Sequence, residues 1–242
     1  MKKITIIIIC SLFVITNIFA QGVSADIQKA QKSGNSIFIV VTDKLAKGTD
    51  YLVKLSEGAN KKVKKNVVLK LDRDEKANAD LVAKYRIAGA QLPIILVVAS
   101  NGVVTGALTS EDASIEKIIS TLPSKTQAEV LLGFENGKAA LIICGKKNAK
   151  DKAAIQTECN TALKSLGDKA TVVFVDVESK EEANFVDLLK PDLTKTTVVI
   201  FNGKGQFTGK MDSVTKSEDL VKTVNKRVGG CAPGSCGSGK KC

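Results

Sequence analysis

The 242-residue sequence contains no histidine, and this single absence removes several kinds of chemistry. A Ser-His-Asp triad, a histidine general base and a histidine-ligated metal each need an imidazole side chain. Tryptophan is also absent, and aromatic residues make up only 4% of the chain, so any core must be built mainly from Val, Ile, Leu and Ala. The remaining composition, 44% hydrophobic and 25% charged with 4 Pro, is that of globular domains and excludes a disordered or collagen-like protein.

The first 20 residues have the pattern of a secretory signal peptide. Lys2 and Lys3 form a short basic region, an apolar run extends to Ile15, and Ala20 provides a small residue for cleavage. No basic stop-transfer cluster follows, and no other apolar stretch reaches the 18 residues that a membrane-spanning helix needs. We therefore expect an exported protein, periplasmic or extracellular, that does not span the membrane once residues 1–20 are removed.

The rest of the chain repeats one order of predicted elements. Val- and Ile-rich runs predict strands, and apolar residues at helical spacing predict helices. The expected strands are 36–42, 67–72, 94–99, 139–144, 172–176 and 198–201, the third and sixth each continuing through an Asn-Gly turn into a further strand. The expected helices are 26–32, 50–61, 77–85, 111–122, 127–134, 151–166, 181–189 and 217–227. Matching residues recur about 103 positions apart: Asp72 and Asp176, Pro93 and Thr197, Thr105-Gly106 and Thr208-Gly209.

This order predicts an α/β fold with two tandem domains. Parallel strands joined by helices and followed by an antiparallel hairpin give a mixed sheet with helices on both faces. We expect domain 1 at residues 22–123, domain 2 at 125–228, and a flexible cysteine-rich tail at 229–242.

Domain 1 carries a family resemblance. Leu71-Asp72-Arg73-Asp74, the run from Ala83 to Pro93, and the turn at Asn101-Gly102 are similar to the thioredoxin segment in which an acidic turn and helix lead to a cis-proline loop and a hairpin. The resemblance implies two tandem thioredoxin-like domains. It also implies that Pro93 is the family's cis-proline and that Leu92 and Pro93 form a peptide-contact surface.

The sequence departs from that family where its chemistry lies. The resemblance implies two cysteines separated by two residues after the first strand, but the loop Asp43–Asp50 has none, and neither has domain 1 as a whole. Thiol–disulfide exchange at the usual place in domain 1 is therefore excluded. In domain 2, Cys144 stands at the strand end, a lysine holds the partner position, and Thr197 is expected at the proline position.

Two cysteines lie within domain 2. The neighbouring Lys146 and Lys147 would stabilise a Cys144 thiolate, whereas the alternative is a small buried residue at a strand end. Cys159 lies on the apolar stripe of its helix, which predicts burial. A Cys144–Cys159 disulfide would require that helix to pack back over the strand.

The tail contains three of the six cysteines on a Gly- and Ser-rich segment. In one interpretation Cys231 and Cys236 form a local disulfide, which leaves Cys242 to pair with another molecule. Alternatively they would bind Cu(I), or Zn²⁺ with a fourth ligand, because three thiolates suit these ions. A third interpretation is an exposed tail whose cysteines become oxidised but have no function. No other cofactor is expected.

The net charge of +11 is spread as lysines along both domains. Basic patches interleaved with aromatic residues, which nucleic-acid binding would require, are not visible. We expect a protein or peptide partner in the cell envelope, no nucleic acid, and a possible disulfide-linked oligomer.

The leading hypothesis is an exported, non-catalytic thioredoxin-like binding or scaffold protein with a disulfide-linked or metal-binding tail. One alternative is an envelope thiol–disulfide oxidoreductase with Cys231, Cys236 and Cys144 as redox candidates. Another is a copper- or zinc-handling protein that uses the tail thiolates. The missing thiol pair and the missing histidine speak against enzymatic activity in the two domains.

Overall fold

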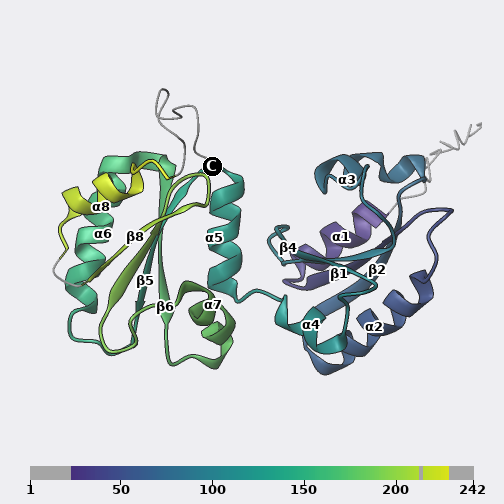
Figure 1. Cartoon of the computed structure of the whole chain (residues 1–242), viewed down its shortest axis with the longest axis horizontal. Helices are drawn as coiled ribbons and strands as arrows, with labels where there is room; N and C mark the ends of the chain where they lie inside the picture. Colours follow the sequence, from purple (N-terminus) through teal and green to yellow (C-terminus); the bar gives the residue numbers. More distant parts are fainter. Residues whose placement is uncertain (1–22, 213–214, 229–242) are drawn as a thin grey trace, which may run out of the picture.

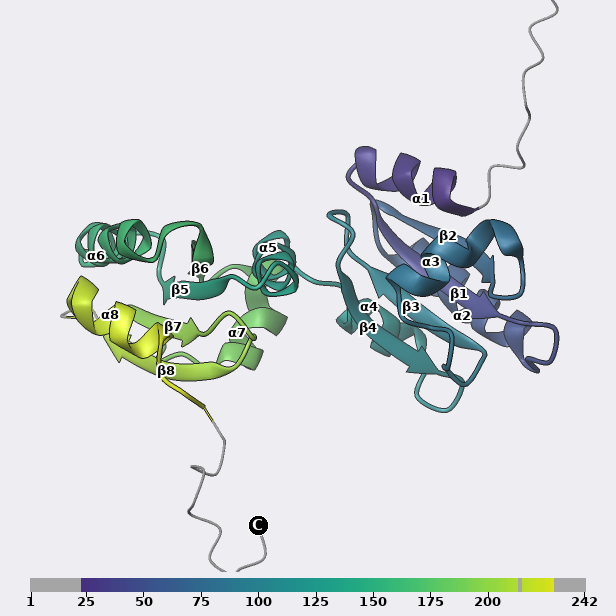
Figure 2. The same ribbon diagram turned by 90° about the horizontal axis from the view of Figure 1, so that it is seen from above.

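The computed structural model describes residues 23–212 and 215–228, which form two four-stranded sheets (Figures 1 and 2). In domain 1 the elements are α1 (Val23–Lys32), β1 (Ser36–Thr42), α2 (Thr49–Lys62), β2 (Asn66–Asp72), α3 (Ala79–Lys84), β3 (Ile94–Val98), β4 (Val104–Thr109) and α4 (Ile115–Ser120). In domain 2 they are α5 (Lys125–Glu135), β5 (Ala139–Gly145), α6 (Lys152–Leu166), β6 (Ala170–Asp176), α7 (Ala183–Leu189), β7 (Thr197–Phe201), β8 (Phe207–Asp212) and α8 (Ser217–Val224).

The two sheets have the same topology. Their strand orders are β2-β1-β3-β4 and β6-β5-β7-β8, and in each the first two strands pair in parallel while the other pairs are antiparallel. The parallel pairs end together, with Thr42 opposite Asp72 and Gly145 opposite Asp176. The two mixed sheets flanked by helices confirm the fold class expected from the sequence.

The central strands β1 and β5 are buried on both faces because helices cover both. Ile37 and Ile39 of β1 pack with α1 and α3, whereas Phe38 and Val40 pack with α2 and α4. In β5 the same alternation places Ala140 and Ile142 with α5 and α7, and the neighbouring residues with α6 and α8. This explains why the two strands read as continuous apolar runs instead of alternating ones.

The recurring Thr-Gly pair has the same structural role in both domains. Thr105 and Thr208 donate hydrogen bonds across their hairpins to the carbonyls of Val97 and Ile200, at 3.2 and 3.1 Å. The following glycine lies against the closing helix of its domain. A Cβ atom at Gly106 would lie 2.4 Å from Thr121, and one at Gly209 would lie 2.9 Å from Thr223. Both copies of the repeat therefore need a residue without a side chain at this position, so that the edge strand can pack closely against the residues of the closing helix.

Two local expectations need correction. Helix α4 starts at Ile115 instead of residue 111, because the Ser114 hydroxyl caps it by accepting from the Lys117 amide at 3.1 Å. The helix expected at 77–85 is a 3₁₀ turn, Lys76–Asn78, followed by the six residues of α3. The hairpin turns lie at the expected residues, with Gly102 and Gly205 at positive φ, and each hairpin also contains a bulge that the sequence pattern did not indicate.

Candidate functional site

The loop after β1 occupies the place where the resemblance implies a redox thiol. It runs from Asp43 to Gly48, and α2 begins at Thr49. The hydroxyl oxygens of Thr42 and Thr49 lie 2.7 Å apart across the loop, and the Leu45 amide donates to the Asp43 carboxylate at 3.0 Å. The loop thus carries hydroxyl and carboxylate groups at the place where the resemblance implies two cysteine thiols.

Arg73 connects this loop to the segment that leads to Pro93. It follows β2 directly, and its guanidinium forms an ion pair with Asp43 in which both side chains are largely buried. The other terminal nitrogen, Nη1, donates to three backbone carbonyls: Ile87 at 3.3 Å, Ala88 at 3.1 Å and Ala90 at 2.8 Å. Guanidinium suits this arrangement because its donors are held in a rigid plane. Sequence reasoning treated Arg73 only as part of an acidic turn and missed this role.

The peptide bond between Leu92 and Pro93 is cis, as the resemblance implied. Pro93 is buried and immediately precedes β3, whereas Leu92 is half-buried. Because Arg73 holds residues 87–90, the Asp43 loop and the Pro93 loop form one connected edge of domain 1, which we call the Arg73 edge. A polar cleft of about 350 Å³ opens beside it and includes Asp43, Thr49 and Asp72 among its lining residues.

Domain 2 has a different structure at the corresponding edge. Val177 occupies the position of Arg73, since each donates its backbone N–H to the last residue of the central strand, at 3.1 and 2.9 Å. The strand registers make Thr196, not Thr197, the structural equivalent of Pro93, since Ile94 pairs with Val41 and Thr197 pairs with Cys144. The connection from β6 to β7 is one residue shorter than the connection from β2 to β3. Thr196 is buried and its hydroxyl donates to Asp151 at 2.6 Å. The assignment of Thr197 to the proline position is therefore wrong by one residue.

Cys144 lies inside β5, not in the following loop. It pairs with Val175 and Thr197, corresponds to the core residue Val41 of domain 1, and is fully buried. Burial raises the pKa of its thiol to about 12, although the nearby Lys210 acts in the opposite direction. A thiol with this pKa is almost entirely protonated near neutral pH. This opposes a redox role for Cys144, and Lys146 pairs instead with Glu178 at 2.7 Å.

Cys159 lies on the other face of the same sheet. Its side chain packs with Leu141 and Ile143 under α6, whereas Cys144 packs with Ile142 under α5 and α7. Both thiols are free, and burial also raises the pKa of Cys159 to about 12. Since the sheet separates the two side chains, the Cys144–Cys159 disulfide considered from the sequence does not form in this structure.

The three tail cysteines, Cys231, Cys236 and Cys242, lie outside the described residues, as does the signal peptide. Within residues 23–212 and 215–228, no three His, Cys, Asp or Glu side chains gather in a way that could hold a metal ion. Among these same residues, none of the helices has both the length and the apolar character of a membrane span.

Comparisons with known proteins report distant structural likeness only. No family model and no curated protein matches the chain. Among solved structures, the first two thioredoxin domains of Saccharomyces cerevisiae Eps1p are similar at 14% identity, covering 86% of this chain and 97% of that one, with a TM-score of 0.34. The zinc-bound form of human ERp44 is 14% identical, with 83% and 57% covered and a TM-score of 0.35. The N-terminal domain of alkylhydroperoxide reductase AhpF from Enterococcus faecalis is 12% identical, with 83% and 98% covered and a TM-score of 0.29.

Proposed function

We propose that this chain is an exported, non-catalytic thioredoxin-like binding protein whose partner is a protein or peptide of the cell envelope. Leu92 and Pro93 form its peptide-contact surface in domain 1. The tail cysteines Cys231, Cys236 and Cys242 carry a disulfide that links the chain to itself or to another molecule.

The Arg73 edge is the observation that supports this proposal. A catalytic thioredoxin-type site needs a low-pKa thiol at a helix N-terminus. In domain 1 that place is held by Thr49 and by the Asp43–Arg73 ion pair, and in domain 2 the described thiols are buried with raised pKa values. The loop is thus fixed in place around the cis-proline segment without a group that could exchange disulfides.

The first test measures exchange activity. Reduction of insulin by dithiothreitol is followed with the full chain and with a variant carrying Cys231→Ser, Cys236→Ser and Cys242→Ser. We expect neither protein to accelerate the reaction. Acceleration by the full chain alone would establish the tail as the redox centre and overturn the proposal. Stoichiometric copper or zinc in the full chain, absent from the triple variant, would support metal handling instead.

The second test locates the contact surface in the cell. A photo-crosslinking residue, p-benzoylphenylalanine, is placed at Leu92 and, as a control, at Lys61 at the end of α2. We expect a discrete adduct from position 92 that position 61 does not form, because only position 92 adjoins the Pro93 loop. The same set of adducts at both positions, or none at position 92, would contradict a peptide-contact role for Leu92.

A further inference from the structure

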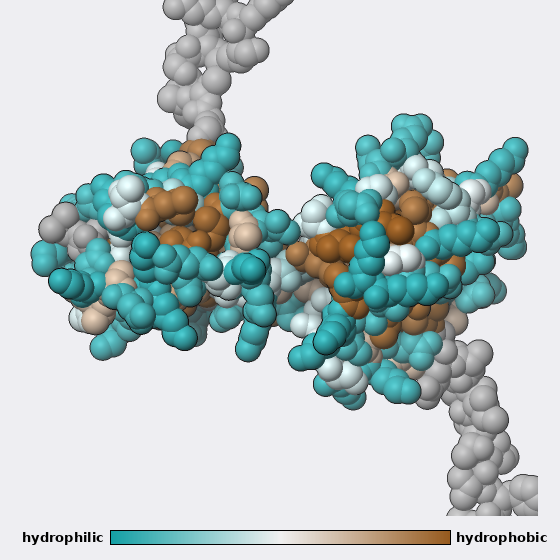
Figure 3. Space-filling view, turned by 90° about the horizontal axis from the view of Figure 1, so that it is seen from below, coloured by the Kyte–Doolittle hydropathy of each residue, from teal (hydrophilic) through white to brown (hydrophobic). Residues whose placement is uncertain are grey.

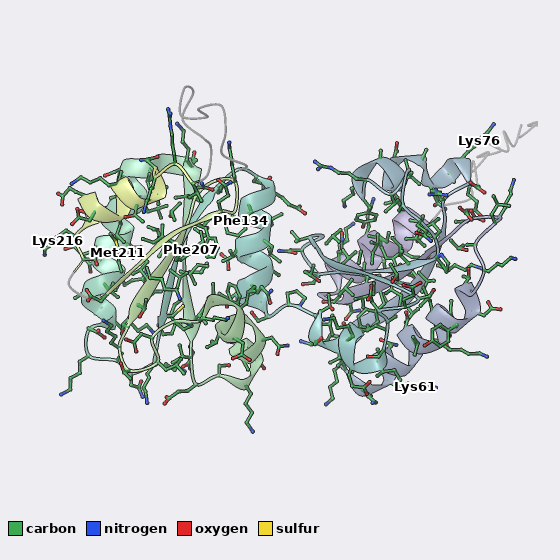
Figure 4. All side chains as sticks on the ribbon, in the orientation of Figure 1. Lys61, Lys76, Phe134, Phe207, Met211 and Lys216 are labelled. Atoms are coloured by element: carbon green, nitrogen blue, oxygen red, sulfur yellow. The ribbon has the colours of Figure 1, made fainter. Side chains whose placement is uncertain are left out.

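An apolar groove of about 490 Å³ lies on the α5 and α7 face of domain 2. It is lined by Phe134 of α5, by Leu188 and Leu189 of α7, and by Phe201 and Phe207 of β7 and β8. Figure 4 labels Phe134 and Phe207 between the helix and the strands. Helix α5 packs mainly against β5 and β6, and the Phe207 ring of β8 stays half exposed on this face.

The groove presents large apolar side chains to solvent. Leu188 is 68% exposed and Phe207 is 48% exposed, and both stand among its lining residues. The rings of Phe134, Phe201 and Phe207 form a row with centroid separations of 5.6 and 5.9 Å. Apolar surface appears on both domains in the space-filling view, bordered by hydrophilic side chains (Figure 3). An aromatic row with an open side provides both area and shape for an apolar ligand side chain.

Domain 1 shows that the fold itself does not require this groove. The matching elements place Gln31 where domain 2 has Phe134, because Gly102 and Gly205 adjoin these two side chains in the same way. Lys84 of α3 likewise corresponds to Leu188 of α7, since both helices follow a 3₁₀ turn at the same distance. Two of the bordering apolar residues in domain 2 are thus polar in its structural duplicate.

The interior of the groove also differs from domain 1. Tyr85, which corresponds to Leu189, is buried and fills the space between α3 and the sheet with a larger side chain. Val104 corresponds to Phe207 at the start of the edge strand. Domain 2 therefore has a smaller side chain inside and a larger one at the rim, a combination that opens a cavity and lines its mouth.

The charges at the groove have one sign. Among the described residues that line it, the ionisable ones are Lys190 and Lys210, and none carries a carboxylate. The Lys210 ammonium donates to the Lys190 carbonyl, which places it at the end of α7, and it also lies 6.0 Å from the centre of the Phe207 ring. A ligand that places apolar side chains on the phenylalanines would meet a positive charge next to them. This favours an acidic group adjacent to the apolar one.

We propose that this groove binds an extended peptide segment in which bulky apolar residues lie next to acidic ones. The segment belongs to another polypeptide, because residues 1–22 and 229–242 of this chain contain two lysines each and no Asp or Glu. The site is separate from the Arg73 edge of domain 1 and does not depend on the function proposed for that edge.

Binding of three peptides with fluorescein on the N-terminal amine tests this site in the full chain: fluorescein-Gly-Leu-Phe-Glu-Asp-amide, the matched Gly-Leu-Phe-Lys-Lys peptide, and the Gly-Ala-Ala-Glu-Asp peptide without the apolar anchor. We expect the first to bind at least tenfold more tightly than the other two by fluorescence anisotropy. Leu188→Lys, which introduces the residue type found in domain 1, should weaken binding at least tenfold. Lys210→Met should reduce the preference for the acidic peptide.

The control variant is Leu193→Lys, which changes another exposed leucine, 58% exposed, that is not among the groove residues. It should leave binding unchanged, and circular dichroism should show that all variants fold. Equal losses in the two leucine variants, or no binding of the first peptide at 1 mM, would overturn the proposal. Concentration-dependent dimerisation that Leu188→Lys alone abolishes would also overturn it, because the occupant would then be a second copy of the chain.

Discussion

Replacing Arg73 with methionine is expected to lower the free energy of unfolding of domain 1 by about 2–3 kcal/mol. The substitution keeps much of the aliphatic volume but removes the ion pair to Asp43 and all three hydrogen bonds to the carbonyls of Ile87, Ala88 and Ala90. It also leaves a largely buried carboxylate without its cation. Tyrosine fluorescence during urea denaturation reports this change selectively, because both tyrosines, Tyr51 and Tyr85, belong to domain 1.

The matched control is Lys62→Met, which breaks an exposed ion pair. Lys62 and Glu116 lie 3.0 Å apart, but their side chains are 55% and 76% exposed, so the loss should be far smaller than that of Arg73→Met. If the unpaired carboxylate causes much of the Arg73→Met effect, adding Asp43→Asn should restore part of the stability. Equal effects of Arg73→Met and Lys62→Met would show that the Arg73 edge is not the structural link described here.

The elements that were predicted well are those whose pattern is local. The strands 36–42 and 139–144 match β1 and β5 to within one residue, since an uninterrupted run of Val and Ile flanked by polar residues has few other interpretations. Helix ends were predicted less well, as at α4, where the expected start at residue 111 lies three residues ahead of the Ser114 cap.

The features that escaped prediction depend on residues far apart in the sequence. Arg73 bonds to carbonyls 14 to 17 positions away, and no local pattern distinguishes it from a solvated turn residue. The one-residue error at Thr196 arises in a loop, where length varies without changing the strand pattern. The differences that open the groove of domain 2 lie at positions such as Tyr85 and Leu189, whose equivalence depends on the strand registers and is not evident from the sequence.

The buried thiols of domain 2 should make its stability fall steeply above pH 9. The pKa of Cys144 and of Cys159 is raised from 9 to about 12 by burial, so both stay protonated in the folded state while the unfolded chain loses these protons. Unfolding then releases protons, and stability that is fully present below pH 9 decreases as the pH rises toward 12. At pH 10 the expected loss is about 1.4 kcal/mol for each thiol.

Far-UV circular dichroism during urea denaturation at pH 8 and pH 10 measures this loss. The comparison protein carries Cys144→Val, the residue of domain 1 at that position, together with Cys159→Ala. The two proteins differ only at these two positions, so the difference between their pH dependences isolates the two thiols. An identical dependence in the two proteins would contradict the raised pKa values.

Alkylation provides an independent measurement on the same groups. With a pKa of about 12, the folded thiols present about a thousandfold fewer thiolates at pH 8 than cysteines with the ordinary value of 9. Iodoacetamide should therefore modify Cys144 and Cys159 only after the chain is unfolded, as located by mass spectrometry of the digested protein. Rapid modification of Cys144 in the folded chain would return it to the set of redox candidates, because only an accessible thiolate can attack a disulfide.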